Sequence, residues 1–236
     1  MVFLTFGMET GYFRFAGKEK DDRTVYSTAF YSLLTTSTIF IVIISLFAKH
    51  IVNALGYSNN PEYLILISVI VGLDAFCAIP FARLRLQNKA LTFSVIKIIS
   101  VLVNVLLNLF FLTILPKYSF FNEYFPGAQN LGITYVFISN VISSVVTTLL
   151  LLFFVNGFPP FLKFEKLKPL IIYSLPLLIS GLGGTTNETF DRIFIKYLVP
   201  EESNPLYQLG IYGSNVKLAV LMVLFIQMYR LSLIHI

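Results

Sequence analysis

Long uncharged windows alternate with short charged clusters along this chain. Six windows are mostly apolar, at residues 25–48, 63–84, 90–115, 131–156, 169–198 and 206–230. A helix rises about 1.5 Å per residue, so about 20 residues cross a hydrocarbon core about 30 Å thick. Because lipid offers no hydrogen-bond partners, a spanning backbone must pair internally, as a helix does. The pattern predicts an all-α, polytopic transmembrane helical bundle with about six full spans.

A shorter apolar stretch covers residues 1–15 and leads into a basic run. It would extend only about 20 Å as a helix, too little to cross a bilayer. We interpret it as the inner half of a helix that began outside, with a short interfacial helix as the alternative. We therefore expect native sequence upstream of Met1. The last six residues, 231–236, resemble translated sequencing adapter, so native sequence is expected to differ beyond Arg230.

The composition supports the membrane class. Hydrophobic residues make up 56% of the chain and charged residues only 12%, against about 25% charged in soluble domains. A soluble fold of this size could not bury so much apolar surface in one core. With one cysteine and two histidines, disulfides and thiolate or imidazole metal clusters are excluded. No phosphate-binding glycine loop and no catalytic constellation is present, so we expect no enzyme activity, catalytic residue, metal or cofactor.

The net charge of +5 is distributed as membrane topology requires. Loops alternate between three basic residues and one. The rich clusters are Lys18, Lys20 and Arg23; Arg83, Arg85 and Lys89; and Lys163, Lys166 and Lys168, whereas Lys49, Lys117 and Lys196 stand alone. The positive-inside rule places the rich loops in the cytoplasm. Membrane lipids with anionic headgroups explain these residues without any nucleic-acid partner.

The loop at 157–168 is the best candidate for a linker, because it combines glycine, two prolines and a basic cluster. We predict an N-terminal helical bundle over residues 1–156, a cytoplasmic linker over 157–168, and the start of a second bundle over 169–236.

Four charged side chains fall at membrane depth. Counting along the helices places Glu9 about 12 Å from the cytoplasmic boundary, Asp74 and Lys97 about 15 Å, and Lys217 about 20 Å. Such charges cost roughly 2.5–3.5 kcal/mol each at the bilayer centre, so they are expected to face the bundle interior or a wet cavity. Asp74 and Lys97 match in depth on consecutive antiparallel spans. They form either a structural ion pair or a substrate site in which Asp74 tunes Lys97.

Lys217 has no partner one turn away on its own helix, which favours a substrate contact. Glu9 lies between Gly7 and Gly11, a spacing that allows close helix approach. Its carboxylate is either paired or part of a cation or proton relay.

The window at 169–198 carries a charged face and several helix-weakening residues. Glu188, Asp191, Arg192 and Lys196 share one side, and Glu188 and Arg192 are spaced as a favourable pair. This face is either a paired outer surface or a coupling site. Proline and glycine weaken helices and mark flexing points in transporters. The hinge candidates are Pro80, Pro176, Gly183 and Gly184.

Short motifs in order along nearly the whole chain carry a family resemblance. They are FGMETGYFRF at 6–15, PFARLR at 80–85, YSLPL at 173–177, FDR at 190–192 and LGIY at 209–212, followed by Lys217. With these motifs the chain resembles the polysaccharide and O-antigen flippases of the multidrug/oligosaccharidyl-lipid/polysaccharide exporter superfamily. The motifs would then end the second and fourth helices, lie in the seventh and open the eighth.

The resemblance implies two six-helix bundles around a central cavity used for alternating access, of which this chain would hold part of helix 2, helices 3 to 6, and helices 7 and 8. It implies transport of undecaprenyl-pyrophosphate-linked oligosaccharide from the cytoplasmic to the periplasmic leaflet of the bacterial inner membrane, without enzymatic chemistry. Polysaccharide assembly proteins would be possible partners, and Na⁺ or H⁺ the coupling ion. The cavity candidates are Lys97, Lys217, Arg14 and Asp74; the coupling or ion-pair candidates are Glu9, Glu188, Asp191 and Arg192.

Two alternatives remain open. A multidrug or cation antiporter of the same superfamily would favour a more acidic, aromatic cavity than one with two deep lysines. A membrane polysaccharide polymerase or ligase would carry a large outer loop, and the longest outer loop expected here is 116–130.

Overall fold

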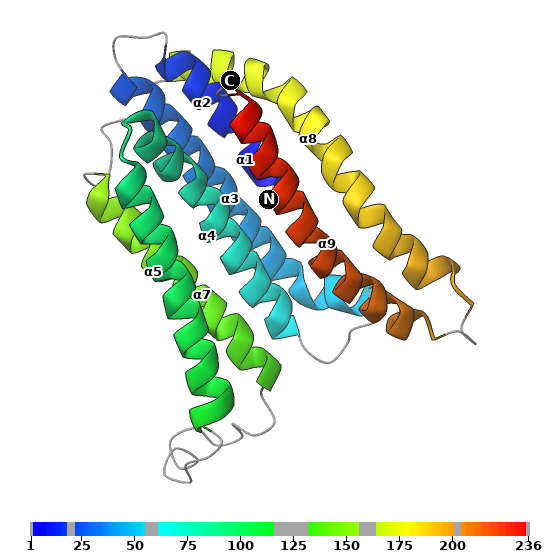
Figure 1. The fold of residues 1–236 in the computed structure, drawn as a ribbon. Helices are drawn as coiled ribbons and strands as arrows, with labels where there is room; N and C mark the ends of the chain where they lie inside the picture. The colour runs from blue at the N-terminus through cyan, green and yellow to red at the C-terminus, as the bar shows by residue number, and fades with distance from the viewer. Residues whose placement is uncertain are drawn as a thin grey trace. The chain divides into compact units, whose positions relative to one another are not determined.

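The computed structural model describes residues 2–17, 22–54, 61–115, 132–155, 164–200 and 204–234. Every regular element in these ranges is a helix (Figure 1), so the predicted all-α class is confirmed. The chain divides into two compact units, Met1–Ile179 and Ser180–Ile236, which are described separately below.

The first unit contains most of the helices. In chain order they are α1 (Val2–Thr5), α2 (Met8–Ala16), α3 (Asp22–Ala54), α4 (Pro61–Leu86), α5 (Ala90–Leu109), the π-helical turn η1 (Phe110–Ile114), α7 (Gly132–Phe154) and the first part of α8 (Phe164–Leu198). α4 is central, because it packs extensively along both α3 and α7, while α5 packs along α7. The second unit holds the rest of α8 together with α9 (Pro205–Ile234).

Five helices among the described residues are long and apolar enough to cross a bilayer. They are Arg23–Ala54, Pro61–Leu86, Ala90–Ile114, Ile133–Phe154 and Leu167–Thr186. Only 6% of the most apolar window of Ala90–Ile114 is buried, and Leu91 and Leu106 on this helix are largely exposed. Such apolar surface is compatible with lipid and not with water. The chain is therefore a multi-pass membrane protein.

The sixth predicted window, 206–230, coincides with α9, which is 30 residues long. Several of its side chains lie outside the described residues. Its role as a membrane span stays a prediction.

The N-terminal stretch is not one continuous helix, because the structure divides it into α1 and α2. Its interpretation as the inner part of a membrane span stays a prediction. Phe6 and Gly7 have positive φ angles of 49° and 64°, which end α1 and begin α2 in a new direction. A left-handed residue cannot continue a right-handed helix. Glycine makes the turn sterically cheap at the second of these two positions.

The close helix approach expected at Gly7 and Gly11 is confirmed, and the partner is the first part of α8. A Cβ atom at Gly7 would lie 2.9 Å from the Cβ of Leu177, and one at Gly11 would lie 2.7 Å from the Ser174 Oγ. Neither distance is compatible with an ordinary contact. The glycines therefore let α2 pack backbone-close to α8.

Aromatic side chains join α2, α3 and α4 in the main core. Tyr12, Tyr26 and Phe30 are fully buried. The Tyr26 ring lies 6.1 Å from that of Tyr12, and the Phe30 ring lies 4.9 Å from that of Phe76. Edge-on aromatic contacts of this kind add to the burial energy. This core fixes α2 against the cytoplasmic ends of α3 and α4 predicted by the charge pattern.

A tight turn connects α4 to α5 and sets their antiparallel register. Asn88 adopts φ 56°, and the Lys89 N–H donates to the Leu84 carbonyl over 2.9 Å. Asparagine tolerates this left-handed cap conformation. As a result Phe81 and Phe93 meet across the two helices, with ring centroids 5.1 Å apart.

The hinge candidates do not interrupt their helices. α4 runs through Pro80, and α8 runs through Pro176, Gly183 and Gly184. Polar groups freed by a proline can be satisfied locally in a membrane helix. Their role as hinges stays a prediction.

The division between the two units falls inside α8, directly after Ile179. This position lies between the hinge candidates Pro176 and Gly183. The predicted linker, 157–168, lies upstream of it. Residues 157–163 are outside the described residues, and 164–168 already belong to α8. The contacts of Ser174 and Leu177 with α2 attach the start of α8 to the first unit. The domain boundaries drawn from the sequence stay a prediction.

Candidate functional site

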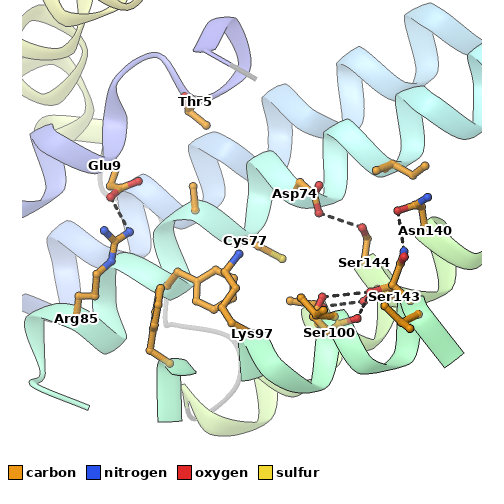
Figure 2. A pocket seen from close by; sticks show the side chains of 18 of the residues that line it. Thr5, Glu9, Asp74, Cys77, Arg85, Lys97, Ser100, Asn140, Ser143 and Ser144 are labelled. Carbon is orange, nitrogen blue, oxygen red and sulfur yellow. Dashed lines mark hydrogen bonds and ion pairs between the residues drawn. The ribbon is translucent and has the colours of Figure 1, made fainter. Parts of the chain in front are cut away.

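A polar cavity of about 760 Å³ lies inside the first unit. It is lined by residues from α1, α2, α4, α5 and α7, four of them charged: Glu9, Asp74, Arg85 and Lys97. Ligand sites in proteins usually enclose about 300–1,000 Å³. Figure 2 shows Glu9 and Arg85 at one end of this cavity, Asn140 at the other, and Lys97 between them.

An ion pair lies at the first end of the cavity. The Arg85 Nη2 donates to the Glu9 Oε1 over 2.6 Å, joining α4 to α2. The Arg85 guanidinium also lies over the rings of Phe93 and Phe13, at 5.5 and 5.6 Å. Since the two side chains are 44% and 36% exposed, the pair contributes little stability by itself. For Glu9, the paired-carboxylate alternative drawn from the sequence is the one that the geometry matches.

Asp74 and Lys97 line the same cavity but do not pair. The Ser144 Oγ donates to the Asp74 Oδ1 over 3.0 Å, and the Lys97 ammonium lies 4.4 Å from the centroid of the Phe81 ring. The two residues form no salt bridge, so of the two alternatives drawn from the sequence, the direct ion pair is the one that the geometry does not match. Counting along the helices gave the two residues the same depth in the membrane, but it could not give their partners. Asp74 accepts from a hydroxyl of α7, and Lys97 lies over an aromatic ring of α4.

Neutral hydrogen bonds connect α5 and α7 along the rest of the cavity wall. The Ser143 Oγ donates to the Ser100 carbonyl over 2.8 Å, and the two hydroxyls lie 3.1 Å apart. One turn further, the Asn104 Nδ2 donates to the Asn140 Oδ1 over 2.7 Å. Such interhelical bonds between side chains stabilise membrane helix pairs modestly.

Arg14 lies elsewhere in the first unit. Its guanidinium stacks over the Tyr173 ring at 4.4 Å, and it does not line the cavity. Tyr173 and Lys168 line a separate groove of about 730 Å³ along the first part of α8 that is otherwise apolar. The sequence analysis named Arg14 as a cavity residue, but the structure places it at the contact between α2 and α8.

The remaining candidates lie in the second unit. The Tyr212 hydroxyl donates to the Asp191 Oδ2 over 2.8 Å, which joins α9 to α8. Arg192 and Lys217 are exposed, and the Glu188 side chain lies outside the described residues. A role for Lys217 or for the Glu188–Arg192 face in substrate or ion binding stays a prediction.

A family model described as a polysaccharide biosynthesis protein matches residues 2–228. The chain belongs to this polysaccharide biosynthesis family. The resemblance inferred from the motifs is therefore confirmed at the level of the family. Comparison with curated proteins and with solved structures found no match.

In this member of the polysaccharide biosynthesis family, three of the four charged cavity residues were candidates from the sequence: Asp74 and Lys97, which were considered together, and Glu9. The sequence analysis missed Arg85, which the charge pattern had assigned to a cytoplasmic loop. It also missed the neutral hydrogen-bonding residues of α5 and α7 that line the cavity, although their spacing in the sequence indicates them. Lys97, Ser100 and Asn104 follow one another at spacings of three and four within an apolar window, as a single helix face requires.

The same periodicity marks α7, where Asn140, Ser143, Ser144 and Thr147 all line the cavity. Polar residues that repeat along one face of a lipid-length helix indicate a surface turned away from lipid. Among the described residues no group of three histidine, cysteine, aspartate or glutamate side chains could hold a metal ion.

Proposed function

We propose that this protein moves undecaprenyl-pyrophosphate-linked oligosaccharide from the cytoplasmic to the periplasmic leaflet of the bacterial inner membrane by alternating access. Family membership supports a role in polysaccharide biosynthesis. The single observation that carries the transport mechanism is the cavity. It brings four charged side chains together among helices whose outer surfaces are apolar.

The physical reason is the cost of moving a charged, hydroxyl-rich headgroup across hydrocarbon. Polar groups without partners lose several kcal/mol each in an apolar medium. A cavity lined by an ammonium, a guanidinium, carboxylates and hydroxyls replaces water as the partner of such a headgroup. The lipid tail can remain in the bilayer throughout, alongside exposed side chains such as Leu91 and Leu106.

Lys97 is the first candidate for the pyrophosphate. Its ammonium faces the cavity and forms no salt bridge with any described residue. An anionic ligand would therefore gain a charge-assisted hydrogen bond without first breaking an internal ion pair. Arg85 would be a second phosphate ligand once it leaves Glu9.

The proposal does not require bond-making or bond-breaking by the protein. The carboxylates of the cavity are engaged with other side chains, Glu9 with Arg85 and Asp74 with Ser144. We propose that these carboxylates couple transport to Na⁺ or H⁺, and that the substrate leaves unchanged.

The test is a flipping assay with the protein expressed from its complete gene and reconstituted in liposomes. Lipid-linked oligosaccharide is supplied in one leaflet, and its arrival in the other is followed with a glycosidase that cannot cross the bilayer. We expect protein-dependent transfer, reduced at least tenfold by Lys97→Gln, because a hydrogen bond to a charged group is worth about 1.5–3 kcal/mol. Lys89→Gln, on the turn between α4 and α5 and outside the cavity, is the matched control.

Transfer at the rate of empty liposomes would refute the proposed function. Transfer that Lys97→Gln and Lys89→Gln leave equally intact would remove the cavity from the mechanism. Drug resistance conferred on a host strain, with no transfer of lipid-linked oligosaccharide, would favour the antiporter alternative.

A further inference from the structure

The cavity is chemically divided along its length. The cations Arg85 and Lys97 lie against the Phe81–Phe93 ring pair at one end. Beyond Lys97 the wall carries no described cation, and its polar groups are one carboxylate with neutral hydroxyls and amides, set among apolar side chains such as Val101 and Val105. Figure 2 shows this order from Arg85 through Lys97 to Asn140.

Unused hydrogen-bonding capacity distinguishes the neutral end from a purely structural contact. An asparagine amide has two N–H donors. Asn104 uses one of them on Asn140, and Asn140 uses one on the carbonyl of Val136, within the described residues. Each amide therefore keeps one N–H for a ligand.

Asp74 adds an acceptor to these donors. Its Oδ1 is held by the Ser144 hydroxyl, whereas no described residue donates to its Oδ2. Asp74 is exposed, Asn104 and Asn140 are half-buried, and all three line the cavity. A fixed carboxylate oxygen and two amide donors are the complement of sugar hydroxyls, each of which both donates and accepts.

Helix geometry gives the two ends a useful separation. Lys97 and Asn104 both line the cavity from α5, seven residues apart, which corresponds to about 10 Å along the helix. A ligand that occupies both ends must therefore be anionic at one end and rich in hydroxyls at the other.

We propose that Asp74, Asn104 and Asn140 form a saccharide subsite, separate from the phosphate-binding end at Lys97 and Arg85. This inference rests on the proposed function and assigns the two halves of its substrate to different residues. The neutral end recognises the sugar attached to the pyrophosphate, and the cationic end recognises the pyrophosphate whatever sugar it carries.

The test compares binding of two lipids by the protein expressed from its complete gene: undecaprenyl pyrophosphate bearing its oligosaccharide, and undecaprenyl pyrophosphate alone. Asp74→Asn keeps the shape of the side chain, and Asn104→Ala removes one amide. We expect each to weaken binding of the glycosylated lipid about five- to tenfold and to leave the bare lipid within about twofold. Lys97→Gln is expected to weaken both lipids alike.

Asn108→Ala is the matched control for the loss of an amide. Asn108 lies one turn beyond Asn104 on α5, donates to its Oδ1 over 2.9 Å and does not line the cavity. We expect the ratio of the two affinities to stay at the wild-type value in this variant, and the melting temperature to report its structural effect.

Equal weakening of both lipids by Asp74→Asn and Asn104→Ala would show that these residues only hold α5 against α7, and would overturn the subsite. No effect on either lipid would overturn it as well. A wild-type protein that binds neither lipid would refute the proposed function itself, which separates that failure from a failure of the subsite.

Discussion

The contact between Gly11 and Ser174 predicts a strong energetic coupling between α2 and α8. The Ser174 Oγ is buried without a hydrogen-bond partner among the described residues. A Cβ placed on Gly11 would lie 2.7 Å from this oxygen and 3.5 Å from the Leu170 Cδ2. The first distance is a clash and the second is an ordinary contact, so Ser174 alone opposes the substitution Gly11→Ala.

The expected energies follow from these distances. Overpacking a close contact costs about 1–3 kcal/mol, while alanine gains about 0.5–1 kcal/mol over glycine in a helix. Gly11→Ala should therefore destabilise the protein by about 0–2.5 kcal/mol. Ser174→Ala should be neutral or slightly stabilising, because it removes a buried hydroxyl that lacks a partner. In the double variant the clash is gone, and the helix gain of alanine remains.

The assay is a double-mutant cycle of unfolding by denaturing detergent in mixed micelles. We expect a coupling free energy of about 1–3 kcal/mol between the two positions. Gly7→Ala is the contrasting control, because its Cβ would meet the fixed Cβ of Leu177 at 2.9 Å and its φ is 64°. Ser174→Ala should not rescue it. A coupling below about 0.5 kcal/mol would show that Ser174 rotates away and that the close approach is not energetically important.

Three further outcomes are expected. Glu9→Gln should change the free energy of unfolding by less than about 1 kcal/mol, because the ion pair is partly exposed. The same variant should bind pyrophosphoryl lipid more tightly, because it frees Arg85, and unchanged binding would contradict this. Lys97→Met should abolish flipping. It should nevertheless raise the free energy of unfolding by about 1 kcal/mol, because a deep charge without a salt bridge is costly, and a less stable variant would contradict this. Gly72→Ala should destabilise by about 1–3 kcal/mol, because its Cβ would lie 2.6 Å from the Ile41 Cδ1 and 2.7 Å from its Cγ1. Detergent unfolding should show that most of this cost disappears in the background of Ile41→Ala, which removes both carbon atoms.

The helices could be predicted from the sequence because the bilayer dictates their length and composition. The window 63–84 became α4, Pro61–Leu86, and 90–115 became α5 with η1. The break at Phe6 could not be predicted in this way. A phenylalanine with positive φ is unusual, and the apolar pattern gives no sign of it.

The cavity was only partly predictable, for a related reason. Residue counting gives the depth of a side chain, but the neighbour it meets depends on how three helices rotate against one another. Asp74 and Lys97 share a depth, but Ser144 of α7 reaches Asp74. Arg85 was assigned to a loop because it lies near the end of α4, although its long side chain reaches Glu9 of α2 at one end of the cavity. Only the polar periodicity of α5 and α7 was available beforehand as a signal.

The distribution of hydrogen bonds in the cavity is itself an argument for a ligand. A polar network that served only to join α5 and α7 would use neutral side chains, as Ser100 and Ser143 do, and would exclude charges, which cost free energy at membrane depth. Instead the Lys97 ammonium has no salt-bridge partner, and the second oxygen of Asp74 has no hydrogen-bond donor, among the described residues. Retaining these groups is unfavourable for folding, which supports the proposal that a ligand enters the cavity and binds them.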